Sequence, residues 1–367
     1  MAAGIDYLPS FWTAAPGSDA RPKALVMQKF EALGDAIIRL PAYRALRMAL
    51  PDHSLIGVYS GRSTYATLFA ALGAELFDGL LVDQPTGRGP AATRGVLAGL
   101  TNIDVVIDFR SNLNALWSFV GSAGLAGRFI ANVPGYALRR GVGLRPAVRP
   151  VHNYDRFHRM AEMVAGRALP FDASLPVAPR MTERAVALLP DDGRRYAGLA
   201  FGGVGWRKAW PRARQIEFLQ HLRRLGLQPV FLLGPYENEE RRFVEAQAPD
   251  AVIVDLTAVD GSEVDLMWLT HALAPRLTLA VAIEGGIGHV LATQGIPLLT
   301  LSGPTDAMTW KPVTPHWWHV AARAFGSNEM AAIPADAVAA RVEEILRWSA
   351  ARSETNDNEA VAALRRA

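Results

Sequence analysis

Residues 277–301, with the sequence LTLAVAIEGGIGHVLATQGIPLLTL, combine two apolar runs with a glycine-rich turn and a short helical pattern. The runs Leu277–Ile283 and Pro297–Leu301 have the length and the aliphatic content of buried strands. Between them, the turn at residues 284–289 (EGGIGH) leads into a predicted helix over Ile287–Gln294. A strand, a helix and a second strand in this order predict a parallel sheet covered by helices.

The same alternation extends upstream of this stretch. Strands are predicted at Tyr196–Phe201, Pro229–Leu233 and Val252–Val254, and helices at Arg212–Leu225, Glu237–Gln247 and Glu263–Leu273. A strongly amphipathic helix is predicted downstream, over Ala335–Trp348. The second half of the chain is therefore predicted to be a regular doubly wound α/β unit.

The first half repeats the pattern less regularly. We predict strands at Lys23–Lys29, Leu55–Tyr59 and Ile103–Asp108, and helices at Ala36–Leu50, Tyr65–Leu72 and Leu113–Val120. The proline-rich segment Leu169–Pro190 has weak periodicity, which is typical of a linker. We therefore expect an N-terminal extension at 1–22, two Rossmann-like domains at 23–175 and 176–350 that face each other across a cleft, and a polar tail at 351–367.

Composition excludes several classes of protein. The 367 residues are 50% hydrophobic and 20% charged, as in a soluble α/β protein rather than a disordered or fibrous one. The formal charge of +3 is too small to indicate nucleic-acid binding. The chain has no cysteine, which excludes disulfides, thiolate nucleophiles and cysteine-based metal sites. We expect a cytoplasmic protein, because the start lacks a secretory pattern and apolar runs stop after about seven residues, so any membrane contact would be peripheral.

Three strand-to-helix turns carry polar residues that suit chemistry. The first runs from Lys29 to Asp35 (KFEALGD) and enters the helix that ends at Pro51. Asp35 either caps this helix or presents a carboxylate at the cleft as a general base.

The second turn runs from Phe201 to Pro211 (FGGVGWRKAWP). Its glycines, including Gly203, would let backbone N–H groups approach an anion that Arg207 or Lys208 could neutralise. The alternative is a flexible loop with solvated basic side chains, because a lone glycine-rich turn is a weak signal.

The third turn contains Glu284, Gly285, Gly286 and His289, and the next strand is followed by Gly303-Pro304-Thr305. A helix that begins just after adjacent glycines offers free N–H groups to a diphosphate, and Glu284 could bind a sugar hydroxyl. Alternatively, Glu284 only complements the helix dipole and His289 is a satisfied, partly buried histidine.

Other signals are weaker. Arg139, Arg140, Arg145 and Arg149 could meet a phosphorylated acceptor, although such a run is more often a solvated loop. His316 and His319 flank two tryptophans, but no carboxylate lies at a suitable spacing, so we predict no metal site. The chain has no HExxH, P-loop, GxSxG or EF-hand motif, which disfavours several hydrolase and NTPase classes.

Taken together and in order, these motifs resemble those of the ADP-heptose:lipopolysaccharide heptosyltransferases, glycosyltransferase family nine, over about residues 23–320. The resemblance is carried by Lys29–Pro51, by the run DVVIDFRSNLN at 104–114, by Lys208-Ala209-Trp210-Pro211, by GPYE at 234–237, and by the third turn with its Gly-Pro-Thr. One departure is Glu284-Gly285, where the family usually has Asp-Ser.

The resemblance implies a GT-B fold with an N-terminal acceptor domain and a C-terminal domain for a nucleotide-sugar donor. Asp35 would be the catalytic base, and Lys208 would stabilise the departing diphosphate. Gly203, Glu237, Glu284, Gly285, Gly286, His289 and Thr305 would bind the donor, and Lys29, Arg139 and Arg140 the acceptor.

The implied activity is inverting transfer of a heptose or related sugar from a nucleotide-activated donor, with ADP as the expected nucleotide, to lipopolysaccharide core or another surface glycan. The nucleotide-sugar is a substrate, and no cofactor or obligatory metal is expected. The alternatives are a sugar-nucleotide epimerase of the same fold and a catalytically silent member that binds nucleotide-sugar or glycan.

Overall fold

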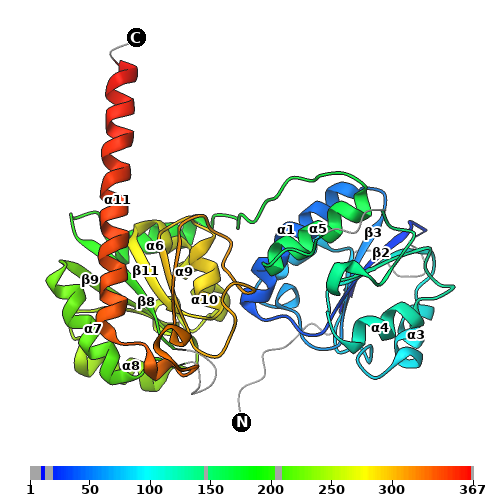
Figure 1. Ribbon diagram of the computed structural model, residues 1–367, viewed down its shortest axis with the longest axis horizontal. Coiled ribbons are helices and arrows are strands. Elements are labelled where there is room, and N and C mark those ends of the chain that lie inside the picture. Colours follow the sequence, from blue (N-terminus) through cyan, green and yellow to red (C-terminus); the bar gives the residue numbers. More distant parts are fainter. Residues whose placement is uncertain (1–9, 13–19, 144–147, 203–208, 365–367) are drawn as a thin grey trace. The chain divides into compact units, whose positions relative to one another are not determined.

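The computed structural model describes residues 10–12, 20–143, 148–202 and 209–364. The chain divides into two compact units. The N-terminal unit comprises Met1–Ser174 with Met308–Val313, and the C-terminal unit comprises Leu175–Ala307 with Thr314–Ala367. Each unit is built around one sheet with helices on both faces (Figure 1).

The sheet of the N-terminal unit has seven described strands in the order β1-β4-β3-β2-β5-β6-β7. The five central strands are parallel, and β1 and β7 add antiparallel edges. The strands are β1 (Ser10–Trp12), β2 (Lys23–Gln28), β3 (Ser54–Tyr59), β4 (Gly79–Leu81), β5 (Ile103–Asp108), β6 (Arg128–Ala131) and β7 (Arg139–Arg140). The first strand of the parallel set, β2, lies in the middle, which is the doubly wound order expected from the sequence.

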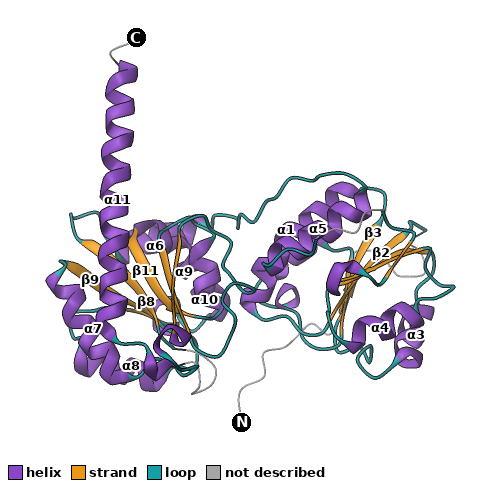
Figure 2. Ribbon diagram, viewed as in Figure 1, coloured by secondary structure: helices purple, strands orange, loops and turns teal. Residues whose placement is uncertain are grey.

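Helices cover both faces of this sheet: α1 and α5 pack together on one face, and α3 and α4 pack together on the other (Figure 2). The helices are α1 (Leu33–Ala49), α2 (Ala70–Leu76), α3 (Pro90–Ala98), α4 (Leu113–Gly121) and α5 (Asn153–Ala165). The predicted helix over Tyr65–Leu72 is wrong in its bounds. The chain instead forms a 3₁₀ turn at Thr64–Ala66, where the Ser63 hydroxyl accepts a hydrogen bond from the Tyr65 N–H, and α2 begins only at Ala70.

The C-terminal unit has a fully parallel sheet of six described strands in the order β10-β9-β8-β11-β12-β13. The strands are β8 (Arg195–Ala200), β9 (Leu227–Leu232), β10 (Val252–Val254), β11 (Leu277–Ile283), β12 (Leu298–Ser302) and β13 (Trp317–Ala321). Alternate residues of β11 enter different cores. Leu279 and Val281 pack on the face that carries α7 and α11, whereas Ala280 and Ala282 pack on the face that carries α6 and α9.

The helices of this unit are α6 (Pro179–Leu188), α7 (Arg212–Arg224), α8 (Asn238–Gln247), α9 (Glu263–Leu273), α10 (Gly286–Ala292) and α11 (Ala335–Leu364). Helix α6 lies inside the segment predicted as an irregular linker. Its buried face is only Met181 and Ala185, one turn apart, so its periodicity was too short to detect. Helix α11 continues to Leu364, well beyond its predicted end at Trp348. Among the described residues, none of the helices combines the length and apolar content needed to cross a bilayer.

Candidate active site

In both sheets the chain reverses its winding direction next to the first parallel strand. In the N-terminal unit this switch lies between β2 and β5, and in the C-terminal unit it lies between β8 and β11. Doubly wound sheets bind ligands just outside the carboxyl ends of the strands at such a point. The turns singled out in the sequence leave β2, β8 and β11, so the candidate sites lie at the carboxyl edges of the two sheets.

Asp35 lies in the first turn of α1, in the turn that follows β2. Its Oδ2 accepts a hydrogen bond of 3.2 Å from the Ala32 N–H, and its Oδ1 lies 3.5 Å from Nη2 of Arg39. The side chain remains 16% exposed. Asp35 therefore caps the helix, as the simpler alternative expected, and still presents part of its carboxylate to solvent.

A buried polar network lies beneath Asp35. The Glu31 side chain is fully buried, and its carboxylate accepts hydrogen bonds from the Tyr43 hydroxyl at 2.9 Å, the Ser63 hydroxyl at 2.8 Å and Nη1 of Arg39 at 3.3 Å. Burial raises the pKa of Glu31, although Arg39 and the two hydroxyls oppose the shift. Burial works against the charge on Arg39, yet Asp35 and Glu31 together raise the pKa of its guanidinium. Arg39 is therefore the cationic partner of both Asp35 and Glu31.

The sequence did not reveal this role of Arg39. Lys29, which the resemblance assigned to the acceptor, has an exposed side chain, and its carbonyl oxygen accepts a hydrogen bond of 3.2 Å from the Ser60 hydroxyl. The cation that lies beside Asp35 is Arg39. The i, i+4 spacing of Asp35 and Arg39 on one helix was the available signal.

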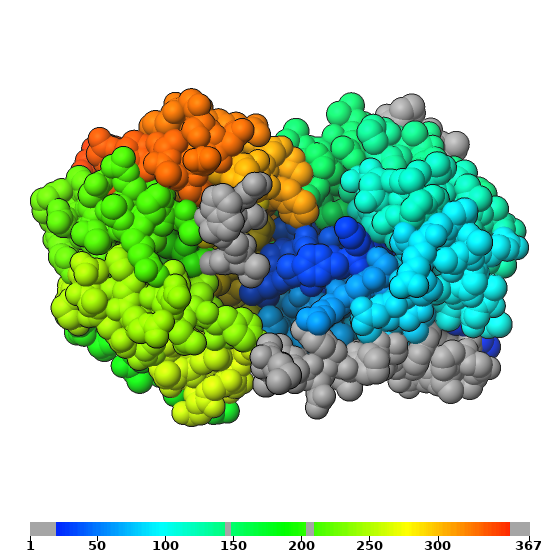
Figure 3. Space-filling view, turned by 90° about the horizontal axis from the view of Figure 1, so that it is seen from below, coloured from blue at the N-terminus to red at the C-terminus, as the bar shows by residue number. Residues whose placement is uncertain are grey.

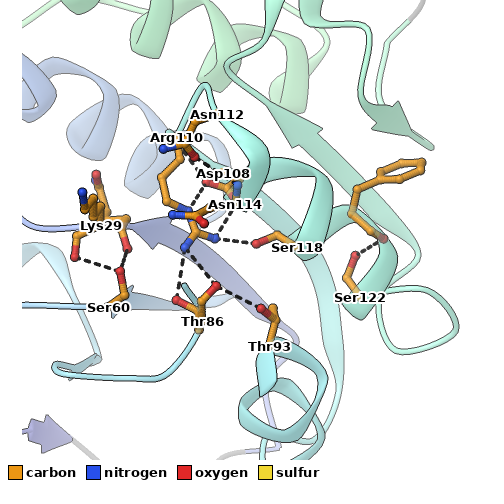
Figure 4. Close-up of polar contacts among 12 residues, drawn as sticks. Lys29, Ser60, Thr86, Thr93, Asp108, Arg110, Asn112, Asn114, Ser118 and Ser122 are labelled. Atoms are coloured by element: carbon orange, nitrogen blue, oxygen red, sulfur yellow. Dashed lines mark hydrogen bonds and ion pairs between the residues drawn. The ribbon is translucent and has the colours of Figure 1, made fainter. Parts of the chain in front are cut away.

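A second buried ion pair lies at the same edge, after β5 (Figure 4). Nε and Nη2 of Arg110 donate to the two carboxylate oxygens of Asp108 at 2.8 and 2.7 Å. The guanidinium also donates to the Thr86 hydroxyl at 3.2 Å and to the Ser118 hydroxyl. Both charged side chains are buried, so this pair joins the turn after β4 to β5 and α4. It was not predicted as part of the site.

Arg139 and Arg140 are not brought to Asp35. They form β7, which is separated from β2 by β5 and β6. The Arg140 guanidinium donates to the carbonyl oxygens of Ser122 and Ala126, in the loop that enters β6, and Arg139 donates to the Tyr136 carbonyl oxygen at 3.3 Å. Their described contacts hold loops of the N-terminal unit.

In the C-terminal unit, Glu237 closes the turn after β9. Its Oε2 accepts a hydrogen bond of 2.9 Å from the Gly234 N–H. Burial raises the pKa of Glu237, opposed by the Gly234 N–H and reinforced by Glu240. The carboxylate packs directly against Gly202, where an added Cβ would lie 2.0 Å from Oε2. A side chain at position 202 would therefore have to displace the Glu237 carboxylate.

A cavity of about 780 Å³ opens beside these two turns, lined by described residues that include Trp210, Arg212, Tyr236, Glu237 and Met330. Trp210 itself is buried, and its indole N–H donates to the Ile333 carbonyl oxygen at 3.0 Å. Gly203 and Lys208, predicted respectively to bind the donor and to act in catalysis, lie outside the described residues.

The third turn leaves β11, next to β8. The Glu284 N–H donates to the Leu301 carbonyl oxygen at 3.0 Å, Gly285 is the N-cap of α10, and Gly286 is its first residue. His289 is buried within α10, and Thr305 follows the neighbouring strand β12. The predicted donor-binding residues that are described therefore all follow the carboxyl ends of β9, β11 or β12, close to the switch point.

The two other histidines singled out in the sequence make polar contacts at the C-terminal sheet. Nε2 of His319 lies 2.6 Å from the Ser302 hydroxyl, and Nδ1 of His316 lies 2.7 Å from the Gly295 carbonyl oxygen. Within the part of the chain that the structure describes, no group of three or more histidine, aspartate or glutamate side chains is arranged to hold a metal ion.

Comparisons with known proteins agree with this architecture. Residues 152–331 match the family model described as glycosyltransferase family 9 (heptosyltransferase). Among solved structures, the chain is similar to a family 9 glycosyl transferase from Veillonella parvula, with 17% identity, 88% of this chain and 97% of the other covered, and a TM-score of 0.62. A search of curated proteins gave no match.

Two further similar structures come from E. coli. The ADP-heptose lps heptosyltransferase II has 16% identity, with 89% of this chain and 99% of the other covered and a TM-score of 0.57. The heptosyltransferase WaaC with ADP has 19% identity, with 88% and 99% covered and a TM-score of 0.54. Identities this low establish the shared fold, and the family model adds a family 9 domain over residues 152–331. The chain therefore contains a glycosyltransferase family 9 (heptosyltransferase) domain and has the GT-B fold of two Rossmann-like sheets.

Proposed function

We propose that this protein is an inverting glycosyltransferase that moves a heptose or related sugar from an ADP-linked donor to a lipopolysaccharide core or another surface glycan. The observation that carries the proposal is the position of Asp35, at the carboxyl edge of the first sheet and held between the Ala32 N–H and Arg39. The choice of an ADP-linked donor is supported by the similar structure of the E. coli heptosyltransferase WaaC, which has been solved with ADP and with ADP-2-deoxy-2-fluoro heptose.

In the proposed reaction, Asp35 accepts the proton of an acceptor hydroxyl. Each carboxylate oxygen has two lone pairs, so one hydrogen bond to Ala32 and one contact with Arg39 leave Asp35 able to accept that proton. The hydroxyl oxygen then forms a bond to the anomeric carbon as the bond from that carbon to the diphosphate oxygen breaks. The attack comes from the face opposite the leaving group, so the anomeric configuration inverts.

Arg39 and Glu31 are positioning residues in this scheme. Arg39 fixes the orientation of Asp35 through its contact with the carboxylate, and the buried Glu31 in turn fixes the position of Arg39. A base whose partners are fixed in advance loses little orientational freedom when the substrate binds, which lowers the activation barrier.

Negative charge that develops on the leaving diphosphate must be stabilised on the donor side. We assign this role to Lys208, together with the backbone N–H groups at Gly285 and Gly286. Glu237, Glu284, His289 and Thr305, with Gly203, complete the proposed donor site. In this proposal Lys208 and the backbone N–H groups stabilise the leaving diphosphate, and no metal ion is required.

The test is an assay of purified protein with ADP-heptose, with and without a lipopolysaccharide core acceptor. The proposal expects a new glycosidic product only when both substrates are present, together with release of ADP. An altered sugar formed from donor alone would identify an epimerase. Tight ADP-sugar binding measured by calorimetry, with no product from any acceptor, would identify a silent binding member, consistent with the departure at Glu284-Gly285.

A further inference from the structure

Helix α4 exposes an apolar stripe on the surface of the N-terminal unit. Leu113, Leu116 and Val120 are 57, 42 and 51% exposed. Their spacing of three and four residues places them along one face of the helix, whereas Ala115 and Ser118 face inward and are buried. Single exposed apolar residues are ordinary, but a continuous stripe marks an interaction surface.

The chain around this stripe is strongly cationic. Residues 84–151 contain eight arginines, two aspartates, and neither lysine nor glutamate. Both aspartates already have cationic partners, because Asp104 pairs with Arg128 and His53, and Asp108 pairs with Arg110. This stretch of sequence therefore carries more positive than negative charge.

Several of these arginines lie close to the stripe. Helix α3 packs tightly against α4, because a Cβ on Gly121 would lie only 2.9 Å from the Pro90 carbonyl oxygen. Arg94, on α3, donates to the Ala123 carbonyl oxygen at 2.8 Å, just beyond the end of α4. Arg140 lies over the Phe119 ring, 5.5 Å from its centroid. Arg88 is exposed in the turn that enters α3.

The stripe also begins at the candidate site. Leu113 is the first residue of α4 and comes shortly after Arg110, at the carboxyl edge of the sheet. Figure 4 shows Asn112 and Asn114 at this edge together with Lys29 and Ser60. The view of Figure 3 looks onto the molecule from the side on which α3 and α4 lie in Figure 1, where the cyan and blue-green residues of these helices adjoin.

We propose that the surface formed by Leu113, Leu116, Val120, Arg88, Arg94 and Arg140, here called the α4 surface, docks on a lipid bilayer that contains anionic lipid. The three apolar side chains would enter the interfacial region of the bilayer, and the arginines would bind lipid phosphates. The excess of arginine over acidic residues is the feature that favours an anionic bilayer as the occupant.

This inference deepens the proposed function, since a lipid-anchored glycan acceptor would then reach the edge that carries Asp35 from the bilayer surface. The docking can nevertheless be measured without donor or acceptor. Failure of docking and failure of transfer are therefore separate results.

The test is sedimentation of the full chain with vesicles of phosphatidylcholine alone or mixed with phosphatidylglycerol. We expect binding to the anionic vesicles, little binding to the neutral ones, and loss of binding at high salt, because salt screens surface charge. The double variant Leu116→Ser with Val120→Ser should bind at least about tenfold more weakly, since two partly buried apolar side chains are lost from the interface. Arg88→Gln should weaken binding about fivefold.

The matched control is Val186→Ser, which removes a 46% exposed valine from α6 in the other unit and should bind like the wild type. Thermal unfolding of each variant checks that the fold is intact. Asp35→Asn should also bind vesicles like the wild type.

Three results would overturn the proposal. Equal binding to neutral and anionic vesicles would show that the arginines do not bind lipid phosphates. Full binding by the Leu116/Val120 variant would show that the apolar stripe does not contribute to docking. The third result is a wild type that does not bind vesicles but self-associates, together with a Leu116/Val120 variant that is monomeric. In that case the α4 surface would be an interface between copies of the chain.

Discussion

The Nη2 atom of Arg39 lies 3.5 Å from Oδ1 of Asp35, one helical turn away on α1. The other terminal nitrogen of the same guanidinium lies 3.3 Å from Oε1 of the fully buried Glu31. The partly exposed carboxylate of Asp35 is thus linked to the buried carboxylate of Glu31 through a single cation. This arrangement predicts that Asp35 depends on the two residues beneath it for its orientation.

Replacing Arg39 by Met should destabilise the protein strongly. The substitution keeps most of the side-chain volume but leaves the Glu31 carboxylate buried without its cation, which typically costs about 3–5 kcal/mol in the free energy of unfolding. Urea unfolding followed by circular dichroism measures this loss. Adding Glu31→Gln to the Arg39→Met variant should restore part of the stability.

The control is Arg214→Met, which breaks an exposed ion pair with Glu217 and should change stability by about 1 kcal/mol or less. If Arg39→Met unfolds at the urea concentration of the wild type, the buried pair does not contribute to stability.

The raised pKa of Glu31 predicts a specific pH dependence of stability. Because the folded protein holds this proton more tightly than the unfolded chain, whose carboxyl has a pKa near 4.5, the folded state binds more protons in the window above that value. The contribution of Glu31 to the free energy of unfolding is therefore greatest below about pH 4.5 and falls as the pH rises through the folded pKa.

Glutamine at position 31 does not titrate, so the melting temperature of the wild type relative to Glu31→Gln should decrease as the pH rises from about 4. Melting curves of both proteins across that range measure the difference. A constant difference, or one that grows with pH, would show that Glu31 is not the group responsible.

The fold and the candidate site were predictable from sequence to different extents. Strand β5 and helix α9 have the predicted bounds, because a continuous aliphatic run marks the strand and Ser262, as the N-cap, marks the start of the helix. The turn with Asp35 was also predictable, since Gly-Asp precedes a helical repeat. The network under Asp35 was not, because Glu31 and Ser63 are far apart in the chain and meet only when β2 and β3 pair.

The Asp108–Arg110 pair should hold two turns at the edge of the first sheet. Asp108→Asn leaves the buried Arg110 charge uncompensated, so we expect a loss of about 3–5 kcal/mol in the free energy of unfolding. Hydrogen exchange should also become faster in peptides that cover residues 84–93, because Arg110 donates to the Thr86 hydroxyl. Unchanged exchange there would show that the pair does not secure this turn.

Gly202 should tolerate a side chain only if Glu237 moves. A Cβ at this position would lie 2.0 Å from the Glu237 carboxylate, so Gly202→Ala must displace Glu237 or separate the two turns. We expect a loss of about 1–3 kcal/mol in stability and weaker ADP binding measured by calorimetry. Gly95→Ala is the control, since nothing lies within 4 Å of its added Cβ. If Gly202→Ala bound ADP with wild-type affinity, the contact between Gly202 and Glu237 would not contribute to donor binding.

The most direct measurement for the proposed chemistry is the turnover of Asp35→Asn with saturating ADP-heptose and acceptor. Asparagine can still accept the hydrogen bond from the Ala32 N–H, so helix α1 keeps its cap. The matched control is Asp336→Asn at the start of α11, where Asp336 accepts a hydrogen bond from the Ala337 N–H at 2.8 Å. We predict that Asp35→Asn lowers turnover about 10²- to 10⁴-fold with unchanged ADP affinity, while Asp336→Asn retains wild-type turnover. Wild-type turnover in Asp35→Asn would contradict the assignment of Asp35 as the base.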